Sequence, residues 1–320
     1  MSRSHSPRRP QLGPLLLRFI LILLFTAVAI YAGYHCLFRA PQQSDQPVQN
    51  TVELSPEEEA LKSHLERKPD FYTILVSGVD DHNGGSDTNI LVAVDAANDS
   101  IYGVSIPRDT KAIINGEAHK INFAYNAGGT ALMAETISDQ LGIPVDYTVQ
   151  VDLQGFVALV DAIGGVTFDV PVDMHYEDPY QDLYIHIDKG LQTLNGENAM
   201  KVVRFRSGYA SQDLGRMQTQ QAFLKAAAQQ TLTPTNLNKI DDFVKIFQSY
   251  VETDLSLGNL AWLGKEAIAM GSDAVSFSTL PNEWKSPYIY LNQEETLALI
   301  NQHLNPYVED RVAEDLNIPS

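Results

Sequence analysis

Residues 72–110 read YTILVSGVDDHNGGSDTNILVAVDAANDSIYGVSIPRDT, and this stretch decides the fold. It contains three short apolar runs rich in β-branched side chains, at 72–79, 89–94 and 101–106. Runs of this length, bounded by Gly, Asp, Asn and Pro, are typical of β-strands. The stretch therefore predicts three successive strands at the start of a globular domain.

Downstream of these strands, segments with helical apolar spacing alternate with further short apolar runs. Residues 153–163, for example, space their apolar side chains for one helix face before Gly164 and Gly165 end the helix. Helices are expected at 130–141, 153–163, 213–230, 236–251, 257–270 and 293–304, and strands at 166–172 and 273–280. This alternation predicts an α/β domain with a single mixed β-sheet flanked by helices.

Residues 19–38, FILILLFTAVAIYAGYHCLF, are almost wholly apolar, and about 20 such residues suffice to cross a bilayer as a helix. Four arginines precede this run and the first carboxylate follows it, which predicts a cytoplasmic N-terminus and an extracytoplasmic domain. No small-residue cleavage motif follows, so we expect an uncleaved anchor. Cys36, the only cysteine, lies in this run as an inert filler or an acylation site, and no disulfide within the chain is expected.

The composition divides the chain into segments. We expect a basic cytoplasmic tail at 1–18, a transmembrane signal anchor at 19–38, an extracytoplasmic linker at 39–70, a catalytic domain at 71–310 and a tail at 311–320. Within the domain, the motifs described below occupy 72–228, and a mostly helical part follows at 231–310.

The charge of the chain and its few arginines limit the classes of ligand that it could bind. Of the 22 Lys and Arg, five lie at or before residue 39, which leaves 17 against 40 Asp and Glu, or −23. Nucleic acid needs a broad basic surface, so this balance argues against it. Only six arginines occur beyond residue 39, and four of them are Arg108, Arg204, Arg206 and Arg216. Arginine binds phosphate through a planar, bidentate fork, so these clusters indicate a local anion site.

Three charged residues follow or precede the first three strands. If the first two strands form a hairpin and the third runs parallel to the first, Asp80, Asp87 and Arg108 reach one edge of the sheet, where α/β folds bind ligands. Asp109 would then brace Arg108. Two neighbouring carboxylates require a cation between them, and Mg²⁺ with substrate phosphate oxygens fits that pattern. The alternative for residues 80–85 is a solvated Asx turn.

The second cluster offers an anion site of a different kind. Arg204 and Arg206 share a face if the backbone is extended, and Arg216 falls in the first turn of a helix that begins at Asp213. Free amide groups at a helix N-terminus also favour an anion. Lys120 lies in a segment with two amides and a phenol that could serve a sugar or a phosphate. The alternative for each arginine is a structural ion pair.

The sequence has no serine-hydrolase, zinc-protease or Walker motif. Its own motifs occur in one order: GVD (78–80), SDT (86–88), SIPRD (105–109), KIN (120–122), VDLQGFVALVDAIGGV (151–166), LNG (194–196), VRFR (203–206) and DLGR (213–216). In this order and spacing, the chain resembles the LytR–CpsA–Psr family of cell-wall enzymes over residues 72–228.

The resemblance implies an αβα-sandwich phosphotransferase that needs Mg²⁺ or Mn²⁺. It would move teichoic acid, capsule or a similar glycopolymer from an undecaprenyl-(pyro)phosphate carrier onto peptidoglycan at the outer face of the membrane. By match to the family motifs, Asp80 and Asp87 hold the metal, and the pyrophosphate contacts Arg108, Lys120, Arg204, Arg206, Arg216 and Gln220. The catalytic residues that it implies are Arg108, Asp109, Arg204 and Arg206.

The sequence departs from the family at two positions. Gly85 and Thr219 stand where the family commonly has arginine. A non-catalytic polyprenyl-phosphate binder or scaffold is therefore a second hypothesis. The family also has a hydrophobic lipid tunnel, for which the plausible wall residues are Phe156, Leu159, Val160 and Phe223, although each equally suits a plain core.

Overall fold

The computed structural model describes residues 38–44, 65–79, 86–178, 183–205, 213–232, 245–247 and 249–320. Apart from Phe38, the predicted anchor lies outside these residues. No helix among them is long and apolar enough to cross a bilayer.

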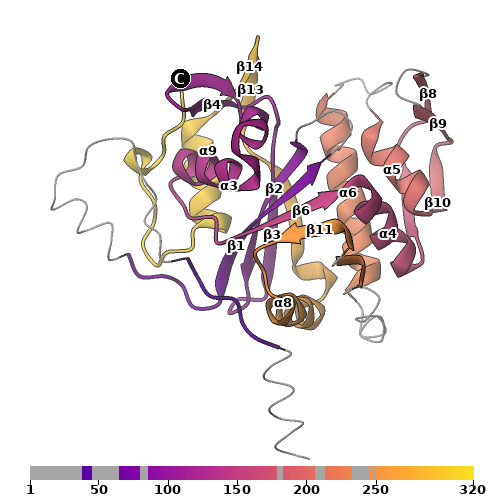
Figure 1. Cartoon of the computed structure of the whole chain (residues 1–320), viewed down its shortest axis with the longest axis horizontal. Helices are drawn as coiled ribbons and strands as arrows, with labels where there is room; N and C mark the ends of the chain where they lie inside the picture. Colours follow the sequence, from indigo (N-terminus) through magenta and orange to yellow (C-terminus); the bar gives the residue numbers. More distant parts are fainter. Residues whose placement is uncertain are drawn as a thin grey trace, which may run out of the picture.

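A six-stranded mixed sheet forms the centre of the domain, in the order β11-β6-β1-β2-β3-β12 (Figure 1). Its strands are β1 (Phe71–Val79), β2 (Ser86–Asp95), β3 (Ser100–Ile106), β6 (Tyr147–Asp152), β11 (Val251–Thr253) and β12 (Val275–Thr279). Strand β2 is antiparallel to both β1 and β3, while β6 is parallel to β1 and β12 is parallel to β3. The predicted hairpin, and a third strand parallel to the first, are both confirmed.

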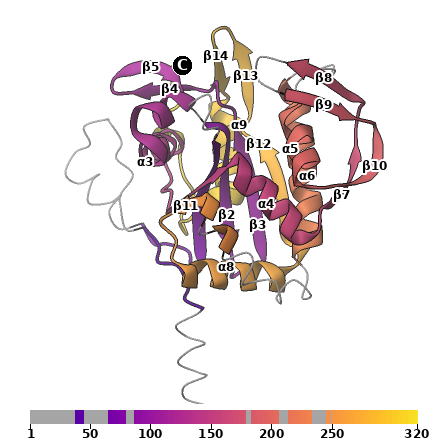
Figure 2. The same ribbon diagram turned by 45° about the vertical axis from the view of Figure 1, so that its right-hand side comes forward.

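Helices cover the sheet on both sides and across one end (Figure 2). They are α3 (Asn122–Leu141), α4 (Leu153–Ile163), α5 (Gly196–Arg204), α6 (Asp213–Thr231), α8 (Leu257–Met270) and α9 (Gln293–Leu299), the last of which continues as the π-helix η3 (Ile300–Leu304). Helix α4 has the predicted bounds, begins at the N-cap Asp152 and ends at Gly164, whose positive φ of 93° suits glycine. Helix α3 begins earlier than predicted and has a kink at Gly128 and Gly129.

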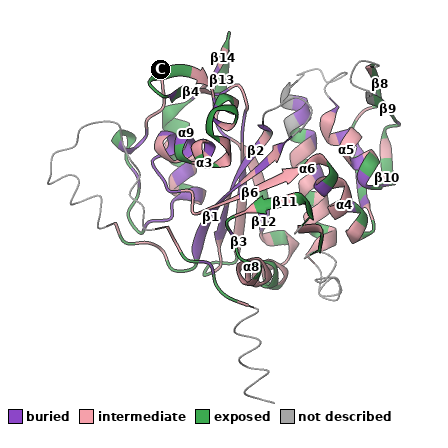
Figure 3. Ribbon diagram, viewed as in Figure 1, coloured by how far each residue is buried: buried purple, intermediate pink, exposed green. Residues whose placement is uncertain are grey.

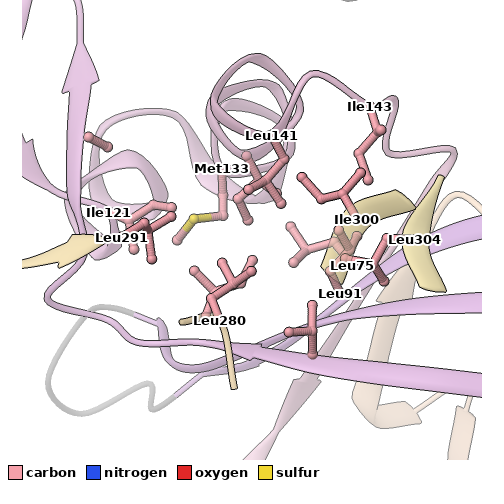
Figure 4. Packing of buried hydrophobic residues seen from close by; sticks show 14 of the residues in the cluster. Leu75, Leu91, Ile121, Met133, Leu141, Ile143, Leu280, Leu291, Ile300 and Leu304 are labelled. Carbon is pink, nitrogen blue, oxygen red and sulfur yellow. The ribbon is translucent and has the colours of Figure 1, made fainter. Parts of the chain in front are cut away.

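The main core lies between the sheet and the pair α3 and α9–η3 (Figure 4). Leu75 of β1 and Leu91 of β2 point into it, because alternate strand residues face opposite sides of the sheet. Met133 of α3 and Leu304 of η3 meet them from the other side. Full burial of such a side chain stabilises the fold by about 1.5–3 kcal/mol.

Four small hairpins and pairs surround the sheet. They are β4 (Lys111–Ile114) with β5 (Glu117–Lys120), β7 (Val166–Val170) with β10 (Gly190–Leu194), β8 (Met174–Asp178) with β9 (Leu183–Ile187), and β13 (Asn282–Lys285) with β14 (Tyr288–Leu291). Of these strands the sequence predicts only β7. Residues 245–247 and 249–250 are also helical, and the short 3₁₀ turns are η2 (Ser272–Ala274) and η4 (Ala313–Asp315).

The described C-terminal part contains strands as well as helices, and residues 236–244 and 248 of the predicted helix 236–251 lie outside the described residues. Strands β11 and β12 form the two edges of the central sheet, so this part is integral to the same domain. Residues 311–320 do not form a separate tail, since Arg311 and Asp315 make a buried ion pair of 2.9 Å and Leu316 packs into the main core. Figure 3 shows that buried residues are concentrated in the central sheet, chiefly in β1.

Candidate active site

One end of the sheet gathers the strand termini that the sequence associates with ligand binding. Strands β1, β3, β6 and β12 end there and β2 begins there. We call this end the rim, and the opposite end, where β1, β3, β6 and β12 begin, the base. The rim points upward in Figure 2 and the base lies next to α8.

Of the two predicted metal ligands, the structure describes only the backbone of Asp87, at the rim. Asp80 directly follows β1 but lies outside the described residues, as does Gly85. The backbone of Asp87 lies in a β-bulge, because the pairing steps from Gly78 opposite Thr88 to Val79 opposite Ser86. Bulges are common next to active sites, where they redirect a side chain. The backbone of Asp87 therefore lies beside the Val79–Ser86 pair, and Asp80 is the next residue in sequence after Val79.

A buried polar cluster lies below this bulge. The Ser77 hydroxyl donates to Asn89 Oδ1 over 3.1 Å, and the Ser86 hydroxyl also contacts that oxygen. All three side chains are buried. Asn89 Nδ2 is also buried and has no hydrogen-bond partner among the described residues. Buried donors normally have partners, so this amide at the rim suits an oxygen ligand that arrives there.

Arg108, Asp109 and Lys120 form one charged group at the end of β3. Asp109 Oδ1 lies 3.1 Å from Lys120 Nζ and 3.8 Å from Arg108 Nε. The Arg108 side chain keeps 32% of its surface exposed, and Lys120 keeps 39%. The backbone here is held rigidly, since Ile289 N donates to Asp109 O over 2.9 Å and Asn122 N to Arg108 O over 3.2 Å. A fixed backbone with partly exposed cations is suited to binding an anion.

The second arginine cluster lies where α5 ends and α6 begins. Arg204 is the last residue of α5, and Arg216 lies in the first turn of α6 with only 5% of its surface exposed. Arg206 lies outside the described residues. The backbone of Asp213 begins α6 as predicted, although its side chain is not described. A nearly buried guanidinium at a helix N-terminus adds to the positive potential of the free amide groups.

Two consecutive glutamines connect the two clusters. Gln220 Nε2 donates to Val203 O over 2.8 Å, next to Arg204. Gln221 Nε2 donates to Thr279 Oγ1 over 2.8 Å and to Ser105 Oγ over 3.2 Å, at the rim ends of β12 and β3. The middle of α6 is therefore fixed between the end of α5 and the strand that leads to Arg108. Gln220, predicted to contact pyrophosphate, has its amide group bound to the backbone.

A pocket of about 560 Å³ lies between α6 and β7. It extends along α6 from Gly215, beside Arg216, to Gln229, and its β7 wall includes Phe168. Thr219 also lines it, with its hydroxyl donating to Gly215 O over 3.0 Å. The apolar part of this wall suits a hydrocarbon chain.

The predicted tunnel residues have a different environment. Phe223 is fully buried and packs against Phe156 and Phe168, with ring centroids 5.9 and 5.5 Å apart. Val160 belongs to the same buried cluster. These side chains form a core between α4, α6 and β7, which is the alternative that the sequence left open for them.

Sequence reasoning missed two residues of this site. Gln221 was visible only as the second member of a glutamine pair, and nothing in the sequence shows that it reaches two strands. Asn89 lies inside an apolar strand, where its burial and unpartnered amide depend on the three-dimensional packing.

The LytR_cpsA_psr family matches residues 38–305 of this sequence, which is most of the chain. The chain belongs to this family. The matched residues include all the motifs quoted above, and they also include the C-terminal strands β11 and β12.

Relatives and solved structures agree with this assignment. The polyisoprenyl-teichoic acid–peptidoglycan teichoic acid transferase TagU of Bacillus subtilis is 30% identical over 80% of this chain and 83% of its own length. TagV of the same organism, with the same activity in its name, is 34% identical over 60% of this chain, and the match covers 51% of TagV. The crystal structure of B. subtilis TagV is similar, with a TM-score of 0.63, 28% identity, and coverage of 75% of this chain and 98% of that one.

Proposed function

We propose that this protein is a membrane-anchored phosphotransferase that moves a glycopolymer from a polyprenyl-diphosphate carrier onto peptidoglycan. The observation that carries the proposal is the pair Gln220 and Gln221, which join the end of α5 and the middle of α6 to the strand that precedes Arg108. The names of the relatives TagU and TagV support the same reaction class and a teichoic acid as the polymer.

The diphosphate would lie at the rim. Arg108 and Lys120 would approach it from the end of β3, while Arg204, Arg206 and Arg216 would approach it from the helices. During in-line attack by an acceptor hydroxyl, negative charge grows on the phosphoryl and leaving oxygens. Guanidinium groups that are already fixed stabilise that charge without reorganising, which is the main contribution of a protein to phosphoryl transfer. No protein nucleophile is required.

A divalent cation fits the rim. Asp80 and Asp87 flank the same pair of strand residues, and their carboxylates are the oxygen donors that Mg²⁺ prefers. They would hold Mg²⁺ or Mn²⁺, which when bound neutralises charge on the phosphoryl oxygens. Among the residues that the structure describes, no group of three or more His, Cys, Asp and Glu is arranged for a metal. Two carboxylates leave most coordination positions of such an ion open, and substrate oxygens would complete the coordination.

The carrier lipid would lie in the pocket along α6, whose upper end adjoins Arg216. The apolar run at 19–38 would anchor the chain with its N-terminus in the cytoplasm. Both assignments place the reaction at the outer face of the membrane.

Transfer of a radiolabelled disaccharide from polyprenyl diphosphate to peptidoglycan tests the proposal. With Mg²⁺, the full-length chain in vesicles should form product, and R108A should reduce the rate by about 10²–10³-fold while remaining folded. K189A, which alters an exposed lysine between β9 and β10, is the matched control and should react normally. Normal transfer by R108A would contradict the role of the rim.

A non-catalytic polyprenyl-phosphate binder is the second candidate. The observation that favours it is Thr219, which lines the pocket where the family commonly has arginine. Tight binding of the lipid by the wild-type chain, with no product from any acceptor in a single-turnover assay, would support this alternative.

A further inference from the structure

Residues 39–44 are bound closely to the base of the domain, and we call them the strap. Arg39 N donates to Gly258 O over 3.1 Å, and Asn259 Nδ2 donates to Arg39 O over 2.9 Å, so the strap begins against the first turn of α8. The Tyr147 hydroxyl accepts from Gln42 N over 2.7 Å and donates to Gln42 O over 2.6 Å. The chain therefore contacts the domain from the first residue after the apolar run.

The strap ends on a buried ion pair. Ser44 N donates to Asp146 Oδ1 over 2.8 Å, and the same carboxylate binds Arg67 over 2.8 Å. Gln43 Nε2 adds hydrogen bonds to two backbone carbonyls, those of Lys68 and Phe71. The strap is therefore hydrogen-bonded to the base at residues 39, 42, 43 and 44.

Helix α8 crosses the base beside the strap (Figure 2). It has 14 residues, of which only Lys265 and Glu266 are charged. None of the 14 is fully buried, but Leu260, Leu263 and Met270 pack against a core cluster of the sheet. The exposed residues of α8 are Leu257, Gly264, Lys265 and Ala269. Leu257 keeps 46% of its surface exposed. The outer face of α8 therefore presents one charged side chain beside Leu257 and two small residues, whereas the chain beyond residue 39 has a charge of −23. A surface with so little charge can approach lipid at a low desolvation cost.

We propose that the base, formed by the strap and the outer face of α8, rests on the lipid bilayer, so that the rim points away from the membrane. The inference rests on the anchor at 19–38 in the proposed function, and it adds the orientation of the domain. The occupant is a lipid surface because the apolar run ends at residue 38 and the strap docks from residue 39. A protein partner at this surface would have to fit between the end of the apolar run at residue 38 and the start of the docked strap at residue 39.

The base also contains acidic residues. Asp70 precedes β1, and Asp95 and Asp99 flank the turn between β2 and β3. These charges repel anionic lipid headgroups. Attachment therefore depends on the anchor and on the weakly charged outer face of α8, and it should not require anionic lipid.

This orientation has a consequence for the substrate. Strand β1 has nine residues at about 3.3 Å each, so the rim stands roughly 30 Å above the base. The pocket along α6 runs from Gly215 at the rim to Gln229, whose neighbour Gln230 binds the backbone of Thr167. A carrier lipid in this pocket would extend from the rim toward the bilayer, which would expose its glycopolymer to the cell wall.

The two tryptophans of the chain provide a direct test. Trp262 lies in α8 at the base, 5.7 Å from the Tyr72 ring, and Trp284 lies in β13 at the rim, 57% exposed. Full-length W284F reports on Trp262 alone, and W262F reports on Trp284 alone. In vesicles of brominated phosphatidylcholine, quenching should remove most of the Trp262 emission and leave the Trp284 emission unchanged.

Other outcomes overturn the inference in distinguishable ways. If Trp284 is quenched, or if neither tryptophan is quenched in a chain that floats with the vesicles, the orientation is wrong while the anchor stands. If the chain does not float with vesicles, the anchor and the orientation both fail, although transfer in detergent would still report the reaction. L257D should reduce Trp262 quenching, and I113D, at an exposed position of β4 near the rim, should not.

Discussion

The base and the rim each contain an aspartate that binds basic groups, but the two aspartates have opposite environments. Asp146 at the base is fully buried and accepts from Arg67, Ser44 N, Thr73 N and the Thr73 hydroxyl over 2.8–3.0 Å. Asp109 at the rim is 23% exposed, and its contacts to Lys120 and Arg108 are 3.1 and 3.8 Å.

The difference separates a structural ion pair from a ligand-binding one. The oxygens of Asp146 are saturated by short hydrogen bonds within the domain, so this carboxylate supports the fold and the strap. The Arg108 and Lys120 side chains remain accessible, so an incoming diphosphate can reach them without breaking the fold. Removing a saturated group should mainly lower stability, and removing an accessible one should mainly lower binding and transfer.

The largest predicted effect on stability is at Asp146. D146A should lower the free energy of unfolding by about 3–5 kcal/mol, because it leaves the Arg67 guanidinium buried without its carboxylate. Urea denaturation of the extracytoplasmic domain measures this loss. Per folded molecule, transfer should remain near the wild-type rate. An unfolding free energy within about 0.5 kcal/mol of wild type would contradict the structural role of Asp146.

Gln221 connects helix α6 to the rim, so it should affect both properties. Q221A should lower the free energy of unfolding by about 1–3 kcal/mol, since it leaves the polar groups of Ser278 and Thr279 without this donor. It should also slow transfer by displacing Arg216. Q220A removes one hydrogen bond to Val203 O and should be milder. Equal transfer rates for Q221A and wild type would show that α6 needs no such connection.

Lys120 is a weaker member of the rim than Arg108, because an ammonium group is a point charge without a bidentate fork. K120A should weaken lipid-diphosphate binding by roughly tenfold, corresponding to about 1.4 kcal/mol. Thermal unfolding should change little, since exposed ion pairs contribute about 0–1 kcal/mol. Titration calorimetry with K201A as the control, a lysine paired with Glu197 on α5, measures the difference. A large loss of stability in K120A would contradict this and would show that Lys120 has a structural role, as Asp146 does.

His303 gives the smallest predicted effect. Its ring stacks on Tyr102 with centroids 3.8 Å apart, and burial lowers the pKa of the imidazole. The folded protein therefore favours neutral His303, and stability should fall as the pH drops below the ordinary value of about 6.5. Comparing urea denaturation of wild type and H303Q at pH 7.5 and 5.5 isolates this contribution. A wild-type protein that gains stability in acid relative to H303Q would show the opposite sign.

Much of the fold follows from local sequence signals. The three opening strands and α4 have strong apolar periodicity and clear stop signals, so their positions are predictable. The strands of the β4–β5, β8–β9 and β13–β14 hairpins have only four or five residues each, which is too short for a clear periodicity. Strand β11 has three residues and depends on pairing with β6, which the sequence cannot reveal.

Local sequence signals also predict part of the candidate site. The order of the hairpin and the third strand brings the termini next to Asp87 and Arg108 to the rim, and this required only local signals. The approach of α5 and α6 depends on side-chain contacts between distant segments, such as Gln221 with Ser105 and Thr279. Such contacts leave no local pattern in the sequence.

A double-mutant cycle on Arg108 and Arg204 tests most directly whether the two arginine clusters bind one diphosphate. The affinity of polyprenyl diphosphate, with Mg²⁺ present, would be measured for wild type, R108A, R204A and the double variant. Each single variant should bind more weakly, and the effects should be non-additive with a coupling energy of about 0.5–3 kcal/mol. Strictly additive effects, or unchanged affinity in either single variant, would contradict a shared site at the rim.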